Sequence, residues 1–539
     1  MKKYLKFLFS TGTLFILTIS MFAGCIQSDS STNKKGTSQL KNTLTILSAS
    51  ENKALDPIIQ DFAKKNGVNI EMHYKGSVDI MNALKENNIA EDAVWPANSI
   101  WISMGDEKHR VKYNQSIMTS PVVFGIKKSK AQELGFVGKN VSIKDILNAT
   151  EQGKLQFMMT SASQSNSGAS AYIGFLYSFL GNPDNITLSD LQKPDLKGNI
   201  KKLLSGVNRS SGSSDWLKDL FLSGNYEAMV NYESVIIETN KQLIKEGKEP
   251  LYAVYPYDGL TIADSPLGYI DKDDSNKENI FKKLQSFLLS QPTQQKILAL
   301  GRRTGIGGTV QNPDKSVFNP DWGIDAEKAI SPIKYPAPDV IQEALNLYQS
   351  EFRKPSYMIF CIDYSGSMES NGGNSGVKQA MNTLLNSDKA KQYMLQLTDQ
   401  DKVVVIPFSG KVISEWKADG NNNLQIQNLI SNINNLRPSG STDIYSPVIQ
   451  GLKELNDVDL SNYIPSIILM TDGQSNTGKN IGDLKQLLKD KNKDIPVFSI
   501  TFGDADSSQL KGISDLTRGT VFDGKSDLIN AFKQARGYN

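Results

Sequence analysis

Short apolar runs and amphipathic segments alternate along the first half of the chain. An apolar run at 44–47 precedes a helical stripe within 56–63, and a second run follows at 68–74. Apolar residues recurring at i, i+1, i+4 and i+5 indicate a helix with one buried face. The alternation continues to about residue 332 and predicts an α/β fold with a mainly parallel sheet.

A second alternating pattern begins at residue 356, and its apolar runs are almost continuous. Strands of this kind are buried on both faces, as in a doubly wound, Rossmann-like parallel sheet. Ligands of such sheets lie beyond the carboxyl ends of the strands. The expected strands are 357–362, 403–408, 464–470 and 497–502, and the expected helices are 377–397, 424–436, 444–455 and 481–488.

Three prolines separate the two patterns, and the last of them, Pro338, opens a helical segment. Proline suits the first turn of a helix, and the segment carries apolar residues at helical spacing. We therefore expect a connector helix between two folded regions. The predicted organisation is 1–24 signal peptide, 25–41 flexible tether, 42–332 first domain, 333–355 linker and connector helix, and 356–539 second domain.

The first residues have a basic start, a short apolar core and a cysteine, Cys25, after small residues. This is a secretory signal, and its end resembles the lipobox of bacterial lipoproteins, with Phe22 where Leu, Val or Ile is usual. The resemblance implies lipidation of Cys25 and attachment to the extracytoplasmic face of the cell membrane. A simple signal peptide with an incidental cysteine is the alternative. The polar stretch after Cys25 is typical of a tether.

Composition narrows the classes of function. Hydrophobic content of 39% and charged content of 22% are ordinary for globular protein, and a net charge of +2 argues against nucleic-acid binding. The only other cysteine, Cys361, lies in an apolar run, so we expect a buried thiol and no disulfide in the mature chain. No stretch after the signal reaches the roughly 20 apolar residues that a membrane-spanning helix needs.

Polar side chains gather at the ends of the predicted strands of the second domain. Asp363, Ser365 and Ser367 follow its first strand, Thr442 precedes a helix, and Asp472 follows the strand at 464–470. Carboxylates and hydroxyls are hard oxygen ligands of the kind that Mg²⁺ prefers, whereas the thiols and imidazoles that favour zinc are missing. Ordinary strand-end turns are the alternative for each segment alone.

These segments resemble the metal-ion-dependent adhesion site of von Willebrand factor type A (VWA) domains, in which Asp-x-Ser-x-Ser combines with a distant Thr and a distant Asp-Gly. The resemblance covers residue 357 to about the C-terminus. It implies that Ser365, Ser367 and Thr442 touch Mg²⁺ (or Mn²⁺) directly or through water, and that Asp363 and Asp472 hold the ion. It also implies that a carboxylate of an acidic protein partner fills the open coordination position.

The first domain resembles periplasmic solute-binding proteins in three segments: a crossover strand at 118–126, a loop running into a helix at 157–174, and a turn at 231–234. The resemblance implies a two-lobed, type 2 periplasmic-binding-protein-like fold with a small solute or oxyanion in the cleft. Serines near helix starts suit anions, although they are also common caps. The candidate solute-binding residues are Ser50, Ser77, Ser165, Ser167, Gly168 and Tyr232.

The joint architecture resembles bacterial lipoproteins that pair a solute-binding domain with a VWA domain. The leading hypothesis is a membrane-anchored binding protein with an acidic partner and a solute, and without enzymatic activity. Delivery of the solute to an ABC permease is the first alternative. A metal-dependent hydrolase is the second, weakened because His73 and His109, the only histidines, lie in no catalytic motif.

Overall fold

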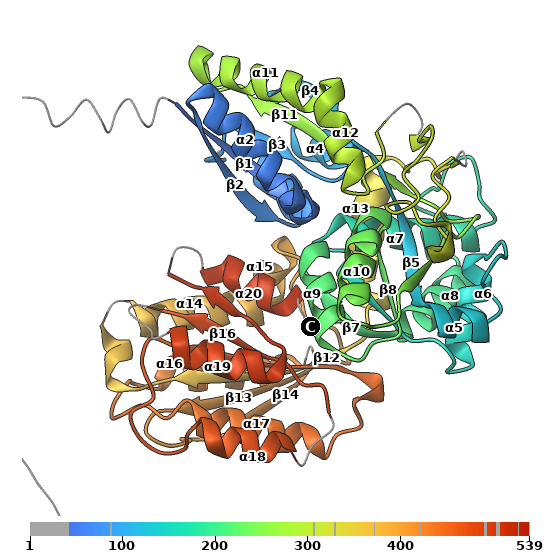
Figure 1. Ribbon diagram of the computed structural model, residues 1–539. Helices are drawn as coiled ribbons and strands as arrows, with labels where there is room; N and C mark the ends of the chain where they lie inside the picture. The colour runs from blue at the N-terminus through green and yellow to red at the C-terminus, as the bar shows by residue number, and fades with distance from the viewer. Residues whose placement is uncertain are drawn as a thin grey trace, which may run out of the picture. The chain divides into compact units, whose positions relative to one another are not determined.

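The computed structural model describes most of the chain from residue 42 to residue 537 (Figure 1). The predicted signal peptide, tether and lipidation site at Cys25 lie outside the described residues. No helix among the residues that are described is long and apolar enough to span a membrane. Within 42–537 the residues left out are 87–88, 305–307, 328–329, 371, 421, 490–492, 503–506 and 526–527.

Lobe one is built on a mixed five-stranded sheet with the order β2-β1-β3-β11-β4. The first three strands are parallel, β11 runs antiparallel to β3, and β4 runs antiparallel to β11 and therefore in the same direction as the first three. The strands are β1 (Thr43–Ala49), β2 (Asn69–Lys75), β3 (Ala93–Trp95), β4 (Val111–Ser116) and β11 (Pro266–Ile270). The helices are η1 (Ser50–Leu55), α2 (Asp56–Asn66), α3 (Ser77–Lys85), α4 (Ser99–Gly105), α11 (Ser275–Leu289) and α12 (Gln291–Ala299).

Lobe two has a second sheet with the order β10-β5-β8-β6-β7, and β9 also pairs with β5. Its central helix is α7, of which 12 of the 14 residues are buried. The strands are β5 (Ser120–Lys127), β6 (Phe157–Thr160), β7 (Val207–Ser211), β8 (Ala228–Tyr232), β9 (Leu251–Val254) and β10 (Ile262–Ala263). The helices are α5 (Lys128–Glu133), α6 (Ile143–Glu151), α7 (Asn166–Phe179), η2 (Asp190–Gln192), α8 (Pro194–Ser205), α9 (Ser214–Ser223), α10 (Glu233–Lys245) and η4 (Pro320–Trp322).

Crossing segments join the two lobes. Thr119 and Arg303 exchange backbone hydrogen bonds of 2.8 and 3.0 Å, and Ile117 N–H donates to Ser265 O at 3.2 Å. The chain passes between the lobes before β5, after β10 and again after α12. The sequence therefore predicted the two-lobed α/β architecture correctly.

The connector helix α13 (Pro338–Leu347) begins at the predicted proline and continues into a short π-helical turn, η5 (Tyr348–Phe352). Its apolar face packs into the same core as α7 of lobe two. Tyr172 Oη donates a hydrogen bond to Ala344 O at 3.0 Å. The connector is therefore part of lobe two rather than a free linker.

The C-terminal domain, residues 356–537, contains a six-stranded sheet with the order β14-β13-β12-β15-β16-β17. Only β14 is antiparallel. The central strands β12, β13, β15 and β16 are buried along almost their whole length, and Cys361 is fully buried, as predicted. The strands are β12 (Ser356–Asp363), β13 (Lys402–Phe408), β14 (Trp416–Asp419), β15 (Ile464–Thr471), β16 (Val497–Thr501) and β17 (Val521–Asp523).

Helices cover both faces of this sheet, which makes the domain doubly wound. Helices α14, α16 and α20 share one core with the sheet, and α17, α18 and α19 share the other. The helix expected at 377–397 is interrupted, because Asn386 caps a separate helix by accepting a hydrogen bond from Lys389 N–H. The helices are η6 (Gly366–Glu369), α14 (Gly373–Leu385), α15 (Ser387–Gln392), α16 (Asn423–Asn435), α17 (Tyr445–Asn456), η7 (Leu460–Asn462), α18 (Ile481–Lys489), α19 (Ser507–Thr517) and α20 (Leu528–Gly537).

Candidate functional site

The five predicted metal ligands lie at the carboxyl ends of the central strands of the C-terminal domain. Asp363 is the last residue of β12, and Ser365 and Ser367 lie in the turn and short helix that follow it. Asp472 follows β15 directly, and Thr442 lies in the loop before α17. Since β12 and β15 are parallel neighbours, their carboxyl ends meet at the same edge of the sheet.

Hydrogen bonds connect four of the five residues into one cluster. Ser365 N–H donates to Asp363 Oδ1 at 2.7 Å. The hydroxyls of Ser365 and Ser367 lie 3.2 Å apart, and Ser367 Oγ donates to Asp472 Oδ1 at 2.8 Å. The sequence motif and the distant Asp-Gly are therefore in direct contact.

Thr442 completes the cluster across Gly473. A Cβ atom built on Gly473 would lie 3.4 Å from Ser367 Oγ and 3.6 Å from Thr442 Oγ1, so the two hydroxyls flank the same small space. The two loops that carry them are tied by a backbone hydrogen bond from Gly366 N–H to Gly440 O of 3.0 Å. All five predicted ligands thus lie together in one oxygen-rich cluster at the carboxyl ends of the strands.

The two carboxylates of this cluster are poorly solvated. Asp363 is 1% exposed, and desolvation is the main cause that raises its pKa to about 6. Asp472 is 6% exposed, and desolvation raises the pKa of its carboxyl as well. Ser367 is exposed, so the cluster opens to solvent on that side. Buried carboxylates with hydroxyls around them gain most from a nearby cation.

The donor set fits a hard divalent cation. Two carboxylates and three hydroxyls are all oxygen donors, which Mg²⁺ and Mn²⁺ accept and which zinc sites seldom use alone. Within the described part of the chain, no group of three or more His, Cys, Asp and Glu side chains is arranged so that it could hold a metal ion. The cluster can therefore hold a cation only if hydroxyls share the coordination with the carboxylates.

Two neighbours of the cluster were not anticipated from the sequence. Thr471 Oγ1 donates to Asp363 Oδ2 at 2.5 Å and accepts from Gly473 N–H at 3.1 Å, so it orients both. Asp443, beside Thr442, instead caps α17 by accepting hydrogen bonds from Tyr445 N–H and Ser446 N–H. The position of Thr471 next to the Asp-Gly pair was the available signal.

The second candidate site is a cavity of about 290 Å³ between the two lobes. Ser50 is the one predicted solute residue among those that line it. The lining carries both charge signs, since it includes two lysines and three aspartates. It consists of Ser50, Lys53, Tyr74, Lys75, Gly76 and Asp79 from lobe one, and Gln164, Gly212, Ser213, Asp215, Trp216 and Asp219 from lobe two.

Four other predicted solute residues make contacts inside the protein and are not part of this lining. Ser77 Oγ accepts from Ala97 N–H at 2.9 Å. The hydroxyls of Ser165 and Ser167 lie 3.3 and 2.8 Å from that of Ser214. Gly168 packs so tightly on β6 that a Cβ there would lie 2.1 Å from Thr160 O. These positions fix α3 and α7 in place.

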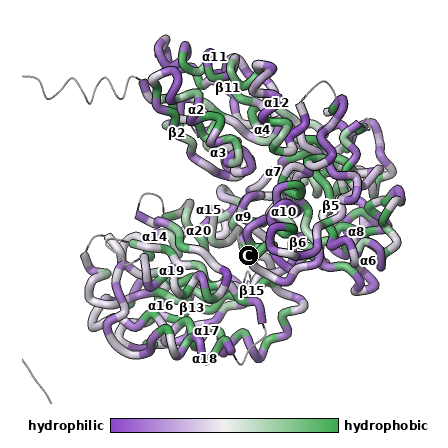
Figure 2. The backbone as a smooth tube through the Cα atoms, in the orientation of Figure 1, coloured by the Kyte–Doolittle hydropathy of each residue, from purple (hydrophilic) through white to green (hydrophobic). Residues whose placement is uncertain are grey.

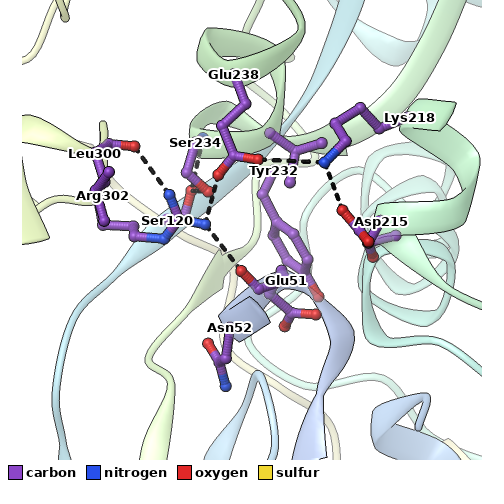
Figure 3. A network of polar contacts seen from close by, with 12 residues as sticks. Glu51, Asn52, Ser120, Asp215, Lys218, Tyr232, Ser234, Glu238, Leu300 and Arg302 are labelled. Carbon is purple, nitrogen blue, oxygen red and sulfur yellow. Dashed lines mark hydrogen bonds and ion pairs between the residues drawn. The ribbon is translucent and has the colours of Figure 1, made fainter. Parts of the chain in front are cut away.

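Tyr232 belongs to a polar network between the lobes (Figure 3). Its hydroxyl accepts a hydrogen bond from Asn166 Nδ2 at 2.9 Å, and Asn166 Oδ1 accepts from Trp101 Nε1 of lobe one at 2.6 Å. Beside it, burial raises the pKa of the Glu51 carboxyl to about 7. The network therefore contains an acid that ionises near neutral pH.

Arg302 is the residue that ties this network together. It is 1% exposed, donates to Glu51 O of lobe one at 2.8 Å, and pairs with Glu238 of α10 at 2.6 Å (Figure 3). Lys218 contacts Asp215 at 2.5 Å in the same network. Sequence reasoning missed Arg302, because its partners Glu51 and Glu238 are far away along the chain.

Comparisons with known proteins agree with this fold. Residues 44–303 match the family model of bacterial extracellular solute-binding proteins, and residues 358–532 match that of the VWA domain. The chain therefore combines a solute-binding domain with a VWA domain, as its sequence suggested. No curated protein matches it.

Solved structures similar to this chain include members of both classes. The periplasmic binding protein AfuA from Actinobacillus pleuropneumoniae is 15% identical, with a TM-score of 0.44, over 57% of this chain and 98% of that one. The sulfate-binding protein SubI from Mycobacterium tuberculosis H37Rv is 15% identical, with a TM-score of 0.40, over 56% and 96%. A von Willebrand factor type A structure from Catenulispora acidiphila is 17% identical, with a TM-score of 0.30, over 35% and 44%.

Proposed function

We propose that this extracytoplasmic binding protein, a solute-binding domain joined to a VWA domain, is anchored to the cell membrane through a lipid on Cys25. Its VWA domain binds Mg²⁺ or Mn²⁺ and, through the cation, an acidic protein partner, while its two lobes take up a small solute or oxyanion. The observation that carries the proposal is the solvent-open oxygen cluster at the strand ends, with metal ligands Asp363, Ser365, Ser367, Thr442 and Asp472.

The composition of the cluster favours a carboxylate partner. Asp363 and Asp472 balance the charge of a divalent cation, and the neutral hydroxyls of Ser365, Ser367 and Thr442 add none. A bound cation would supply an electrophilic position that a carboxylate, as a hard oxygen ligand, can fill. The exposed side of the cluster, at Ser367, is where such a group can enter.

The contacts of the VWA domain with lobe two support this assignment, because they lie at the amino ends of the strands, whereas the oxygen cluster lies at the carboxyl ends. Asp494, just before β16, lies 2.7 Å from Arg518 and also contacts Tyr226 and Arg209 of lobe two. These residues precede the strands β16 and β17, whereas the oxygen cluster follows the strands β12 and β15. The domain can therefore stay attached to lobe two while its metal edge meets a partner.

The solute proposal rests on the cavity between the lobes. Its lysines suit an oxyanion, and its aspartates suit a cationic group such as an amine. Delivery of the solute to an ABC permease is a second candidate function, favoured by the same interlobe cavity. We expect thermal unfolding of the full chain against oxyanions and amino acids to reveal the solute, since a ligand at 100 times its Kd stabilises by about 2.7 kcal/mol.

A metal-dependent hydrolase is less well supported. His73 Nδ1 contacts Glu91 at 3.0 Å on the exposed surface of lobe one, and His109 lies in the loop between α4 and β4. Neither is a neighbour of the oxygen cluster in the domain that follows residue 355. Hydrolysis of a substrate panel that is lost in Asp363→Ala would instead favour this alternative.

The test of the metal proposal is Mn²⁺ binding by the full chain, measured by electron paramagnetic resonance. We expect one tightly bound Mn²⁺, displaced by Mg²⁺, and a large loss of affinity in Asp363→Ala and in Thr442→Ala. Asp459→Ala is the matched control, because Asp459 caps the short helix η7, which precedes β15 and so lies at the amino ends of the strands, away from the cluster. Equal affinity in the parent and in Asp363→Ala would refute the assignment.

Two further measurements address the partner and the anchor. Water proton relaxation by the bound Mn²⁺ should fall when a glutamate-rich peptide is added, and a glutamine-rich peptide should leave it unchanged. Incorporation of radioactive palmitate in bacterial cells should be lost in Cys25→Ser. Labelling that persists in that variant would contradict the lipid anchor.

A further inference from the structure

The last helix of the VWA domain contacts both lobes of the solute-binding domain. Lys533 of α20 forms an ion pair with Asp79 of α3, in lobe one. The backbone carbonyl of the same residue accepts a hydrogen bond from Gln164 Nε2 of lobe two, at 2.6 Å. Helices α20 and α3 are labelled in Figure 2. A single residue of the second domain therefore bridges the two lobes of the first.

The two residues that Lys533 contacts also line the cavity between the lobes. Asp79 belongs to the lobe-one side of that cavity and Gln164 to the lobe-two side. Next to them, Val78 N–H donates to Gln164 O across the lobes at 3.1 Å. A Cβ on Gly76 would lie only 2.1 Å from Gln164 O, so the lobes touch here directly. Lys533 thus reinforces the cavity wall at the point where the lobes meet.

The ion pair is shielded from water. The side chains of Lys533 and Asp79 are 10% and 12% exposed. Removing one partner of a buried pair leaves the other charge desolvated and uncompensated, which is strongly unfavourable. Opening of the lobes would break the ion pair and return both charges to water, so a charge without its partner is penalised only while the lobes are closed. Loss of either partner therefore shifts the lobes toward the open arrangement.

The VWA domain is held to lobe two by several other contacts. Arg209 donates to Arg518 O at 3.1 Å, and Tyr226 contacts Asp494. The connector helix α13 is packed into the core of lobe two. The VWA domain is thus fixed to lobe two, and Lys533 extends from it to lobe one.

We propose that Lys533 is a positioning residue of the solute cleft, and that α20 of the VWA domain holds the two lobes closed. This inference rests on the proposed solute-binding function and deepens it, because it makes the VWA domain part of the solute site. Lys533 acts through Asp79 and Gln164 rather than on the solute itself. Since closure and solute binding are linked, loss of Lys533 weakens solute capture without altering the residues of the cavity.

The test measures lobe closure directly and needs no solute. Spin labels are placed on Lys64→Cys in α2 of lobe one and Lys201→Cys in α8 of lobe two, both exposed, in the full chain carrying Cys25→Ser. Cys361 is fully buried and does not compete for the label. Double electron–electron resonance then reports the distance distribution between the lobes.

We expect one short, narrow distribution in the parent chain. Lys533→Met and Asp79→Asn should each add a longer population, with the open-to-closed ratio rising by roughly tenfold or more. Lys533→Arg and the charge-exchanged pair Asp79→Lys with Lys533→Asp should restore the short distribution. Lys511→Met is the control, because Lys511 pairs with Asp515 at 3.6 Å on the exposed surface of α19.

An unchanged distribution in both Lys533→Met and Asp79→Asn overturns the proposal, and so does a failure of every charge-restoring variant. If Lys533→Met does not fold, Asp79→Asn with its rescue decides the question. Failure of the solute proposal is a separate outcome, namely silence across the solute panel, and it does not change the distance measurement. The two hypotheses can therefore fail independently.

Discussion

Substituting Gly473 by alanine would place one methyl group between the hydroxyls of Ser367 and Thr442. The new Cβ would lie 3.4 Å from Ser367 Oγ and 3.6 Å from Thr442 Oγ1, which are ordinary van der Waals separations. Gly473 is not among the glycines with positive φ, so alanine fits its backbone. We therefore expect the fold to be preserved, with a change in the free energy of unfolding of under about 1 kcal/mol.

The effect on cation binding should be much larger, because the methyl group crowds the space that both hydroxyls face. A cation at 100 times its Kd stabilises the folded state by about 2.7 kcal/mol. For a domain of about 150–250 residues, this corresponds to a rise in Tm of roughly 5–11 °C. We expect the parent chain to show this rise on addition of Mn²⁺, and Gly473→Ala to show little of it.

The assay is thermal unfolding of the full chain in Mn²⁺ and in EDTA. Gly512→Ala is the matched control, since it adds the same methyl group within α19, where its nearest neighbour is Ile481 at 3.9 Å. That variant should keep the full shift, and Asp363→Ala should lose it. An undiminished shift in Gly473→Ala would refute the inference that the two hydroxyls share one cation.

Three further predictions concern stability. The pKa of Glu51 is raised to about 7, so the folded state retains a proton that the unfolded state loses near pH 4.5. Glu51→Gln should therefore be neutral below pH 4.5 and increasingly stabilising from there to about pH 7, which thermal unfolding across pH tests. Asp401→Asn should lower the free energy of unfolding, measured by urea denaturation, by about 3–5 kcal/mol, because Asp401 is fully buried and pairs with Arg353. Gly168→Ala should cost about 1–3 kcal/mol in the same assay, because its Cβ would collide with Thr160 O.

The sequence predicted the central strands of the VWA sheet because they are long and apolar. It missed the edge strands β14 and β17, which have four and three residues. β14 reads Trp-Lys-Ala-Asp and is mostly exposed or half-buried, so it carries no buried run. Short edge strands are specified by pairing with a neighbour rather than by their own hydrophobic pattern. The same limit applies to the break at Asn386, which divides a continuous helical pattern.

The oxygen cluster could be predicted because three of its members stand within five residues. The motif Asp363, Ser365 and Ser367 is local, and its turn brings them together whatever the rest of the chain does. The cleft could not be predicted in this way. Ser77 and Ser167 do lie in the first turns of helices, as expected, but their hydroxyls form hydrogen bonds within the protein instead of facing the cavity.

The charged residues that couple the lobes make contacts with residues far away along the chain, which no local pattern encodes. Arg302 and Glu51 are 251 positions apart, and Lys533 and Asp79 are 454 apart. A lysine in a C-terminal helix is ordinarily predicted to be exposed to solvent. Its burial against a distant aspartate depends on tertiary packing alone. The residues that couple the lobes were therefore found only in the structure.

The position of Lys533 follows from the topology of the VWA sheet. The parallel strands of this sheet all have their carboxyl ends on the side that carries the oxygen cluster. The helix after β17 must therefore run back toward the side where the strands begin. Asp494 and Arg518, which contact lobe two, lie on that same side, at the amino ends of the strands. The C-terminal part of α20 therefore lies next to the cleft, while the oxygen cluster lies at the carboxyl ends of the strands, away from it. A chain ending before Lys533 should therefore keep the oxygen cluster and lose the contact with Asp79, which makes cation binding and lobe closure separable.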